Sequence, residues 1–173
     1  MKIYVVRHGE TNMGKNKVIA TEEEPLNENG IQQAILLGEK LRNKKIDIVY
    51  CSTIQRAQDT LRLFDLDESI PVIIEDRIKE RNMGIYENTP FDRLDWKEFW
   101  GINSEKKYTE LESMKSVYER VSKFLEEIKI KEKDKNILIV SHGGVIRTID
   151  WYFNGFNDKM FACENCKVYE YNL

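Results

Sequence analysis

Histidine, cysteine and proline are scarce in this sequence: 173 residues contain two histidines, three cysteines and three prolines. Three cysteines cannot form a disulfide framework, which argues against a small secreted protein held together by disulfides. Cys163 and Cys166 form a single C-x-x-C pair, Cys51 stands alone, and no second pair exists. We interpret all three as ordinary thiols rather than Cys163 and Cys166 as half of a zinc site.

Long apolar runs and an excess of one charge are also missing. No run approaches the roughly 18 apolar residues that cross a bilayer. The net charge is only −3, with lysines interleaved among glutamates. We therefore expect neither a membrane nor a nucleic acid as partner. The first residues already belong to an apolar strand, which leaves no room for a signal peptide and predicts a cytoplasmic protein. The length fits one domain over residues 1–173.

The two histidines occupy equivalent places in the sequence. Residues 3–6 form a short β-branched apolar run that ends in Arg7-His8-Gly9. Residues 137–140 form a second such run, which ends in Ser141-His142-Gly143-Gly144. Short uncharged runs of this kind predict buried β-strands. In open α/β sheets ligands bind at the carboxyl edge of the strands, so both imidazoles are candidates for a binding site there.

Strands and helices are predicted to alternate along the chain. We expect further strands at 46–51 and 71–74, and a short edge strand at 168–171. Helices are predicted from the N-cap Asn27 to about 44–45, from a Ser52-Thr53 cap to about 64, and over 91–100, 111–131 and 145–153. Residues 10–25 are predicted to form a loop. This alternation predicts an α/β fold, a three-layer α/β/α sandwich with a mostly parallel central sheet.

The carboxyl ends of parallel strands meet at one edge of the sheet, so Arg7, His8, Arg56 and His142 are expected to converge. The loop after the third strand could add Glu80. Two guanidiniums and two imidazoles form an anion site that suits phosphate oxygens. A neutral imidazole beside them can act as a nucleophile toward phosphorus.

Five segments resemble the histidine phosphatase superfamily, in the branch that includes cofactor-dependent phosphoglycerate mutase. Segment 7–11, Arg-His-Gly-Glu-Thr, resembles the family signature. The others follow in family order: 25–30 with Gln33-Ala34, 52–60 with its Arg-Ala pair, the acid loop at 80–87, and 141–144 with Ile146-Arg147. The resemblance covers nearly the whole chain and implies a phosphoglycerate mutase-like fold.

The resemblance also implies a role for each matching residue. His8 would become phosphohistidine, while Arg7, Arg56 and His142 would hold the transferring phosphoryl group. Glu80 would protonate the leaving oxygen and then help to deprotonate water. No metal and no cofactor is implied. The expected function is therefore a phosphomonoesterase, with a small phosphorylated metabolite as its substrate.

The sequence departs from the family beside the nucleophile. The asparagine usually found six positions after it is replaced by Gly14, and the downstream glutamine-glycine by Ile19-Ala20. Asn12 and Asn16 flank the changed position, and either could substitute for the missing amide. We take Asn12 as the candidate substrate-binding residue here, together with Gly143 after the second histidine.

Several alternatives remain beside the phosphatase. A cofactor-dependent phosphoglycerate mutase is the first, although such mutases carry a longer insertion before the second histidine. A non-catalytic phospholigand-binding protein is the second, although such proteins typically lose a nucleophile, arginine or histidine that is present here. Zinc ligation by His8 and His142 lacks an Asp or Cys at ligand spacing. Trp96, Phe99 and Trp100 could line a substrate mouth, but we favour a partly buried amphipathic helix.

Overall fold

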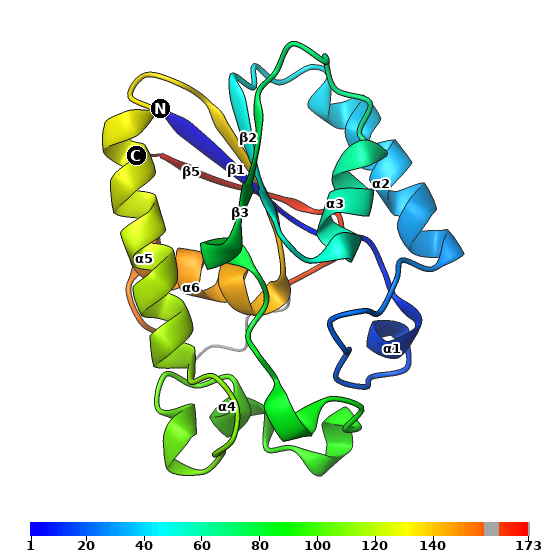
Figure 1. Ribbon diagram of the computed structural model, residues 1–173, viewed down its shortest axis with the longest axis vertical. Coiled ribbons are helices and arrows are strands. Elements are labelled where there is room, and N and C mark those ends of the chain that lie inside the picture. The colour runs from blue at the N-terminus through cyan, green and yellow to red at the C-terminus, as the bar shows by residue number, and fades with distance from the viewer. Residues whose placement is uncertain (158–162, 173) are drawn as a thin grey trace.

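The computed structural model describes residues 1–157 and 163–172, and its centre is a five-stranded sheet (Figure 1). The strands are β1 (Lys2–Arg7), β2 (Ile48–Ser52), β3 (Val72–Glu75), β4 (Ile137–Ser141) and β5 (Val168–Asn172), in the order β3-β2-β4-β1-β5. All neighbouring pairs are parallel except β1 with β5. β5 is the predicted edge strand, and it is antiparallel.

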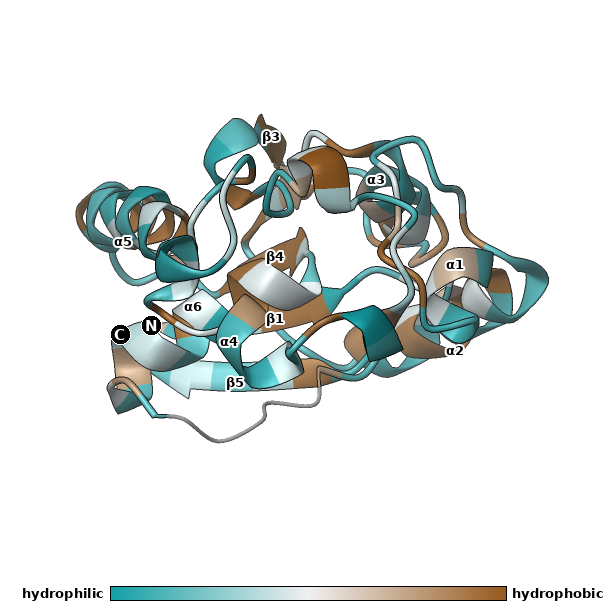
Figure 2. Cartoon of the chain, turned by 90° about the horizontal axis from the view of Figure 1, so that it is seen from below, coloured by the Kyte–Doolittle hydropathy of each residue, from teal (hydrophilic) through white to brown (hydrophobic). Residues whose placement is uncertain are grey.

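Helices cover both faces of this sheet. On one face lie α2 (Glu28–Leu41) and α3 (Gln55–Arg62), and on the other lie α5 (Met114–Lys131) and α6 (Gly143–Asn154) (Figure 1). Alternate residues of β1 belong to different cores, because successive side chains of a strand point to opposite faces. Ile3 and Val5 pack with α5 and α6, whereas Tyr4 and Val6 pack with α2. The predicted three-layer α/β/α fold is confirmed, and Figure 2 shows apolar β1 and β4 at its centre.

The ends of two predicted helices were misplaced. α2 ends at Leu41 rather than at 44–45, and its buried face uses Leu37, while Ile31 and Ile35 are partly exposed. Ser52 is the last residue of β2 and does not cap α3, whose first residue is Gln55. The Ser52 hydroxyl instead accepts a hydrogen bond from the Ile54 backbone and contacts His142.

The connections hold more structure than the sequence predicts. The expected loop at 10–25 contains a one-turn helix, α1 (Asn12–Lys15), whose N-cap Thr11 accepts a hydrogen bond from Gly14. The single helix predicted at 91–100 is wrong. The structure has a 3-10 turn, η3 (Phe91–Arg93), and then the short α4 (Trp96–Phe99). Leu94 between them is extended, and the Asp95 carboxylate caps α4, which restarts the chain in a new direction.

Residues 76–111 form a compact irregular unit beside the sheet edge. It contains three further 3-10 turns, η1 (Asp76–Ile78), η2 (Gly84–Tyr86) and η4 (Ser104–Lys106). Its own small core is aromatic, with Phe99 and Tyr108 buried together with Met83 and with Ile19 from the first loop. Over residues 1–157 and 163–172, no helix has both the length and the apolar character that a membrane span requires.

Candidate active site

The predicted convergence at the carboxyl edge of the sheet is present in the structure. Arg7 ends β1 and pairs in register with Ser141 at the end of β4, so the residues that follow, His8 and His142, lie side by side. Their ring centroids are 5.1 Å apart. Arg56 reaches the same point from the first turn of α3. The sheet register therefore brings the two histidines together.

The hydrogen bonds of His8 determine which of its nitrogens is free to react. Nδ1 lies 2.8 Å from the Gly9 carbonyl oxygen, which can only accept a hydrogen bond, so Nδ1 carries the proton. Nε2 lies 3.3 Å from Nε of Arg56, which can only donate. Both contacts require the same tautomer, because a neutral ring with a proton on Nδ1 has its lone pair on Nε2. Nε2 therefore carries the lone pair and faces the Arg56 guanidinium.

The backbone around His8 is fixed by close contacts. The Gly9 amide donates to the Thr60 hydroxyl, and the Asn165 side-chain amide donates to the His8 carbonyl. A Cβ atom on Gly9 would lie 2.4 Å from the Gly30 carbonyl oxygen, which no side chain could tolerate. Gly9 is thus required because α2 approaches the strand end directly.

Both arginines are held in place by carbonyl oxygens. Arg56 donates to the carbonyls of Thr21 and Glu22, and Arg7 donates to the carbonyl of Cys163. These acceptors leave part of each guanidinium available to an anion. Arg7 Nε is buried without a hydrogen-bond partner in the described part of the chain. Buried polar atoms are almost always paired, so this one indicates a ligand that supplies the acceptor.

His142 is the N-cap of α6 and is completely buried. Its Nε2 lies 2.7 Å from the Ser52 hydroxyl oxygen, and its Nδ1 has no partner among the described residues. The N-terminus of a helix favours negative charge, so α6 adds to the attraction for an anion at this edge.

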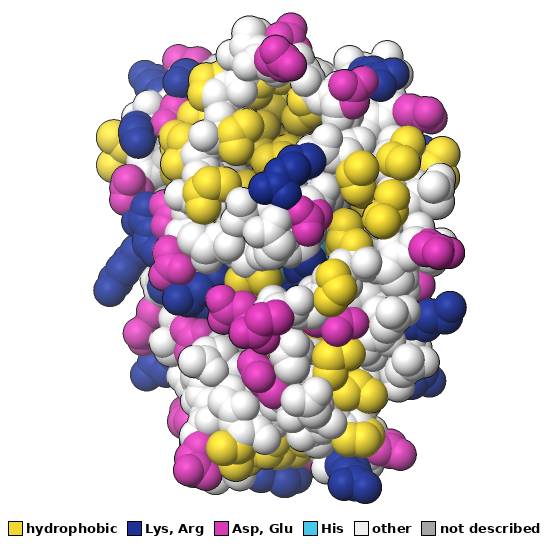
Figure 3. Space-filling view, turned by 45° about the vertical axis from the view of Figure 1, so that its right-hand side comes forward, with side chains coloured by type: hydrophobic (Ala, Val, Ile, Leu, Met, Phe, Trp, Pro, Cys, Tyr) yellow, Lys and Arg dark blue, Asp and Glu magenta, His cyan; other side chains and the backbone are white. Residues whose placement is uncertain are grey.

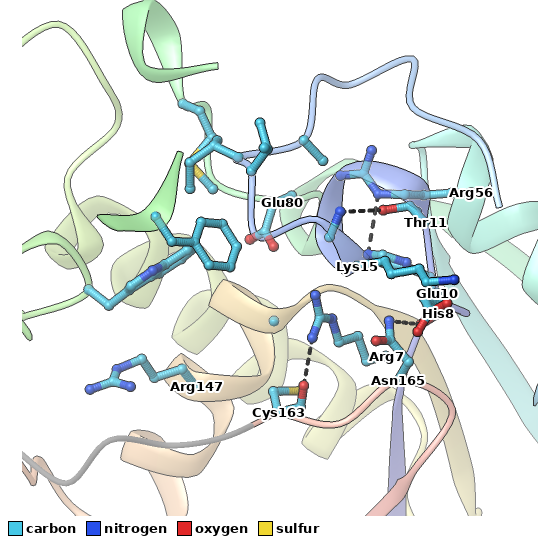
Figure 4. A pocket seen from close by; sticks show the side chains of 18 of the residues that line it. Arg7, His8, Glu10, Thr11, Lys15, Arg56, Glu80, Arg147, Cys163 and Asn165 are labelled. Atoms are coloured by element: carbon cyan, nitrogen blue, oxygen red, sulfur yellow. Dashed lines mark hydrogen bonds between the residues drawn. The ribbon is translucent and has the colours of Figure 1, made fainter. Parts of the chain in front are cut away.

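Glu80 lies on the loop after η1, in the pocket that His8, Arg7 and Arg56 also line (Figure 4). Its carboxylate accepts hydrogen bonds from the backbone amides of Arg81 and Gly144. A Cβ on Gly144 would lie 2.5 Å from Glu80 Oε1 and 2.9 Å from Cζ3 of Trp100. The absent side chain of Gly144 therefore allows the carboxylate and the indole to meet above the start of α6.

The electrostatics of the site keep both imidazoles neutral. Burial, followed by the charges of Arg56 and Arg7, holds the pKa of His8 well below its usual 6.5. Burial also lowers the pKa of His142, with His8 and the two arginines adding to the effect. Desolvation disfavours a protonated ring, and nearby cations disfavour it further. His8 is therefore uncharged at neutral pH, with its lone pair on Nε2.

The pocket has a volume of about 310 Å³ and opens on the face drawn in Figure 3, where basic side chains lie inside a central hollow. Gly143 lines it, as do Thr11, Gly14 and Lys15. The candidate Asn12 is exposed on α1, and its neighbours rather than its own side chain form the wall. Gly14 thus leaves space where the family usually has an amide.

Sequence reasoning missed one side of the pocket. Its apolar lining includes Val18, Ile19, Ala20, Met83, Phe91, Trp96 and Trp100. The sequence analysis favoured a partly buried amphipathic helix for Trp96, Phe99 and Trp100. Trp96 and Phe99 do lie on the short α4, but Trp96 and Trp100 also line the pocket. The available signal was the aromatic cluster at 91–100, which contains Trp96 and Trp100. Within the described residues, no group of three or more His, Cys, Asp or Glu could hold a metal ion.

Comparisons with known proteins identify the family of this chain. The profile of the histidine phosphatase superfamily (branch 1) matches residues 3–173. A probable phosphatase of Schizosaccharomyces pombe is 28% identical over 172 residues, which cover 97% of this chain and 79% of that protein. A probable phosphoglycerate mutase of Yersinia pestis is 30% identical over 150 residues, 83% of this chain and 70% of that protein. YhfR of Bacillus stearothermophilus superposes with a TM-score of 0.84 at 25% identity, covering 98% of this chain and 89% of that one.

The fold and the site define an enzyme that acts on phosphate esters at the carboxyl edge of an α/β sheet. The chain belongs to the histidine phosphatase superfamily, branch 1, and it is a phosphatase of the histidine type. The resemblance inferred from the five sequence segments is confirmed, and so is the assignment to the hydrolases.

Proposed function

We propose that this protein hydrolyses a small phosphate monoester through a phosphohistidine on Nε2 of His8. The observation that carries the proposal is the pair of contacts on His8, with Nδ1 on the Gly9 carbonyl and Nε2 facing Arg56. An imidazole held in this tautomer, with a lowered pKa, presents a lone pair to a buried anion site.

The first chemical step transfers the phosphoryl group to the enzyme. Arg7, Arg56 and His142 bind the phosphoryl oxygens and stabilise the charge that develops on them. Nε2 of His8 forms a bond to phosphorus as the bond from phosphorus to the ester oxygen breaks. Glu80, in its protonated form, gives its proton to that oxygen, and the alcohol leaves.

The second step returns the enzyme to its starting state. A water molecule attacks phosphorus, and the Glu80 carboxylate takes its proton. The bond from phosphorus to Nε2 breaks, inorganic phosphate leaves, and His8 regains its lone pair. Arg7, His8, Arg56 and Glu80 line the same pocket, and His142 is buried beside His8. This placement supports the proposed roles.

The experiment follows the phosphoenzyme directly. Wild-type protein is mixed with 4-nitrophenyl phosphate and quenched with alkali, and phosphohistidine is located by peptide mass spectrometry. We expect a phosphoryl group on His8, and none anywhere in the His8→Ala variant. Phosphate release from His8→Ala at the wild-type rate would refute the proposal. Phosphate binding without any release by the wild type would instead favour a non-catalytic phospholigand protein.

The relative named as a probable phosphoglycerate mutase gives the second candidate function. A mutase returns the phosphoryl group to a bound glycerate instead of to water. Incubation with 3-phosphoglycerate and a bisphosphoglycerate primer, followed by product separation, distinguishes the two. We expect inorganic phosphate to exceed 2-phosphoglycerate. The reverse result would favour the mutase.

A further inference from the structure

Five apolar residues that line the pocket belong to one packed cluster, here called the aromatic wall. It consists of Ile19, Met83, Phe91, Trp96 and Trp100, all of which line the pocket. The proposed mechanism uses none of these side chains. A pocket that bound only a phosphate group would not need them, so the wall requires an explanation of its own.

The wall is built as a fixed surface. The rings of Phe91 and Trp96 lie 4.2 Å apart, and Trp96 packs edge-on against Trp100 at 5.7 Å. Phe99, fully buried behind them, contacts both indoles. Aromatic pairs in such arrangements hold one another in place beyond the area that they bury. The rings therefore present one shaped face to the pocket.

The wall is also tied to the loop that carries Ile19. The Ile19 amide donates to the Thr89 carbonyl, and the Ile19 carbonyl accepts from the Asn88 amide. The Phe91 amide donates to the Lys17 carbonyl in the same ladder. These backbone bonds join the segment of Ile19 directly to the segment of Phe91. The two parts of the wall are thus held together by the backbone.

The wall begins where the leaving group must lie. The Glu80 carboxylate and the ring of Trp100 both approach the point above Gly144 where its Cβ would be, at 2.5 and 2.9 Å. Since Glu80 is the proposed proton donor to the ester oxygen, the group attached to that oxygen contacts Trp100 within one or two atoms. Ring faces and thioethers bind flat apolar groups and offer no partner for a carboxylate.

We propose that the aromatic wall binds the alcohol part of the substrate, and that the substrate class is phosphate monoesters with an apolar ring one or two carbons from the ester oxygen. This inference rests on the proposed function. Burying one such ring favours the ring-bearing ester over its short alkyl counterpart by about ten- to a hundredfold in kcat/KM. A compact charged ester such as 3-phosphoglycerate gains nothing from this surface.

The test compares esters whose leaving groups differ in shape but not in chemistry. Ethyl phosphate and 2-phenylethyl phosphate both release primary alcohols, so proton donation by Glu80 is matched. We expect kcat/KM for 2-phenylethyl phosphate to exceed that for ethyl phosphate at least tenfold, and to exceed that for 3-phosphoglycerate. Equal values for the two alkyl esters, or a preference for 3-phosphoglycerate, would overturn the inference while leaving the phosphohistidine mechanism intact. Failure of all esters, with no phosphohistidine, would count against the proposed function instead.

Substitutions in the aromatic wall test whether it causes the preference for 2-phenylethyl phosphate over ethyl phosphate. We expect Phe91→Ala and Trp96→Ala to reduce the ratio of the two kcat/KM values by about tenfold. Phe156→Ala is the matched control, because Phe156 packs on Tyr118 and Trp151 outside this pocket. An unchanged ratio in both wall variants would overturn the inference. Phe91→Leu, checked by thermal unfolding, keeps the test decisive if an alanine variant does not fold, since it too should lower the ratio.

Discussion

The two sides of the active-site pocket are built in different ways. The phosphate side comes from the ends of β1 and β4, whose register is fixed, and from the first turns of α3 and α6. The aromatic wall comes from 3-10 turns and a one-turn helix with a small core of their own. Strand ends cannot move without disturbing the main core, whereas the wall can change while the sheet stays intact. We therefore propose that the chemistry depends on the phosphate side and the substrate preference on the aromatic wall.

Removing the nucleophile should have the largest effect of any single substitution. In His8→Ala, no nitrogen remains to accept phosphorus, so turnover should fall by about a thousandfold or more. The variant should still bind inorganic phosphate, because Arg7 and Arg56 remain, and titration calorimetry checks this. If phosphate binding is lost together with turnover, His8 is needed for the anion site itself. Phosphate binding and phosphoryl transfer could then not be separated by this variant.

The rate loss caused by removing the proposed proton donor should depend on the leaving group. Glu80→Gln keeps an acceptor for the Arg81 and Gly144 amides but cannot supply the proton. We expect ethyl phosphate hydrolysis to slow by about a hundredfold or more, and 4-nitrophenyl phosphate hydrolysis by much less, because nitrophenolate leaves without a proton. Steady-state rates on both esters check this. Equal slowing of the two would contradict the acid role of Glu80.

The phosphate side could be predicted from the sequence, whereas the aromatic wall could not. The strands, the parallel sheet and the meeting of His8 with His142 follow from short apolar runs that end in the same motif. Arg56 could be placed because helix α3 begins next to a strand end. Such elements are specified locally, by hydrophobic period and by turn residues.

The wall could not be predicted because its structure depends on distant contacts. Phe99 is buried by Tyr108 and by Ile19, which lies 80 positions away. Arg81, a charged residue in a loop, is buried beneath the rings and satisfied by carbonyls at 99 and 112. No periodic pattern encodes such packing. The helical spacing of aromatic residues over 91–100 was therefore misleading, and the Asp95 cap inside it was the signal overlooked.

Arg81 offers a way to disturb the wall from behind. Its guanidinium donates to the carbonyls of Phe99 and Glu112 and to the Ser104 hydroxyl, and it stacks on the Phe99 ring at 4.8 Å. Arg81→Met leaves these buried acceptors unpaired and should lower the free energy of unfolding by about 2–3 kcal/mol. The preference for 2-phenylethyl phosphate should fall with it.

Denaturant unfolding and the ratio of kcat/KM values measure these two effects. Arg93→Met is the matched control, because Arg93 is exposed on the same segment. An Arg81 variant as stable as the Arg93 variant would show that the wall does not depend on this buried cation.

The last effect should come from pH, and it should act on the phosphate side alone. The protein has only two histidines, and both are buried there with pKa values below 6.5. The unfolded chain binds protons at these rings below about pH 6.5, and the folded chain does not, so acidification favours unfolding. Each ring should contribute a slope of up to about 1.4 kcal/mol per pH unit below pH 6.5.

Denaturant unfolding between pH 7.5 and 5.5 measures the slope above the range where carboxylates titrate. His142→Gln should remove about half of it, whereas Phe91→Ala should shift stability by a constant amount at every pH. A slope unchanged in His142→Gln would mean that His142 binds protons equally in the folded and the unfolded chain, with the Ser52 hydroxyl accepting a hydrogen bond from the protonated ring.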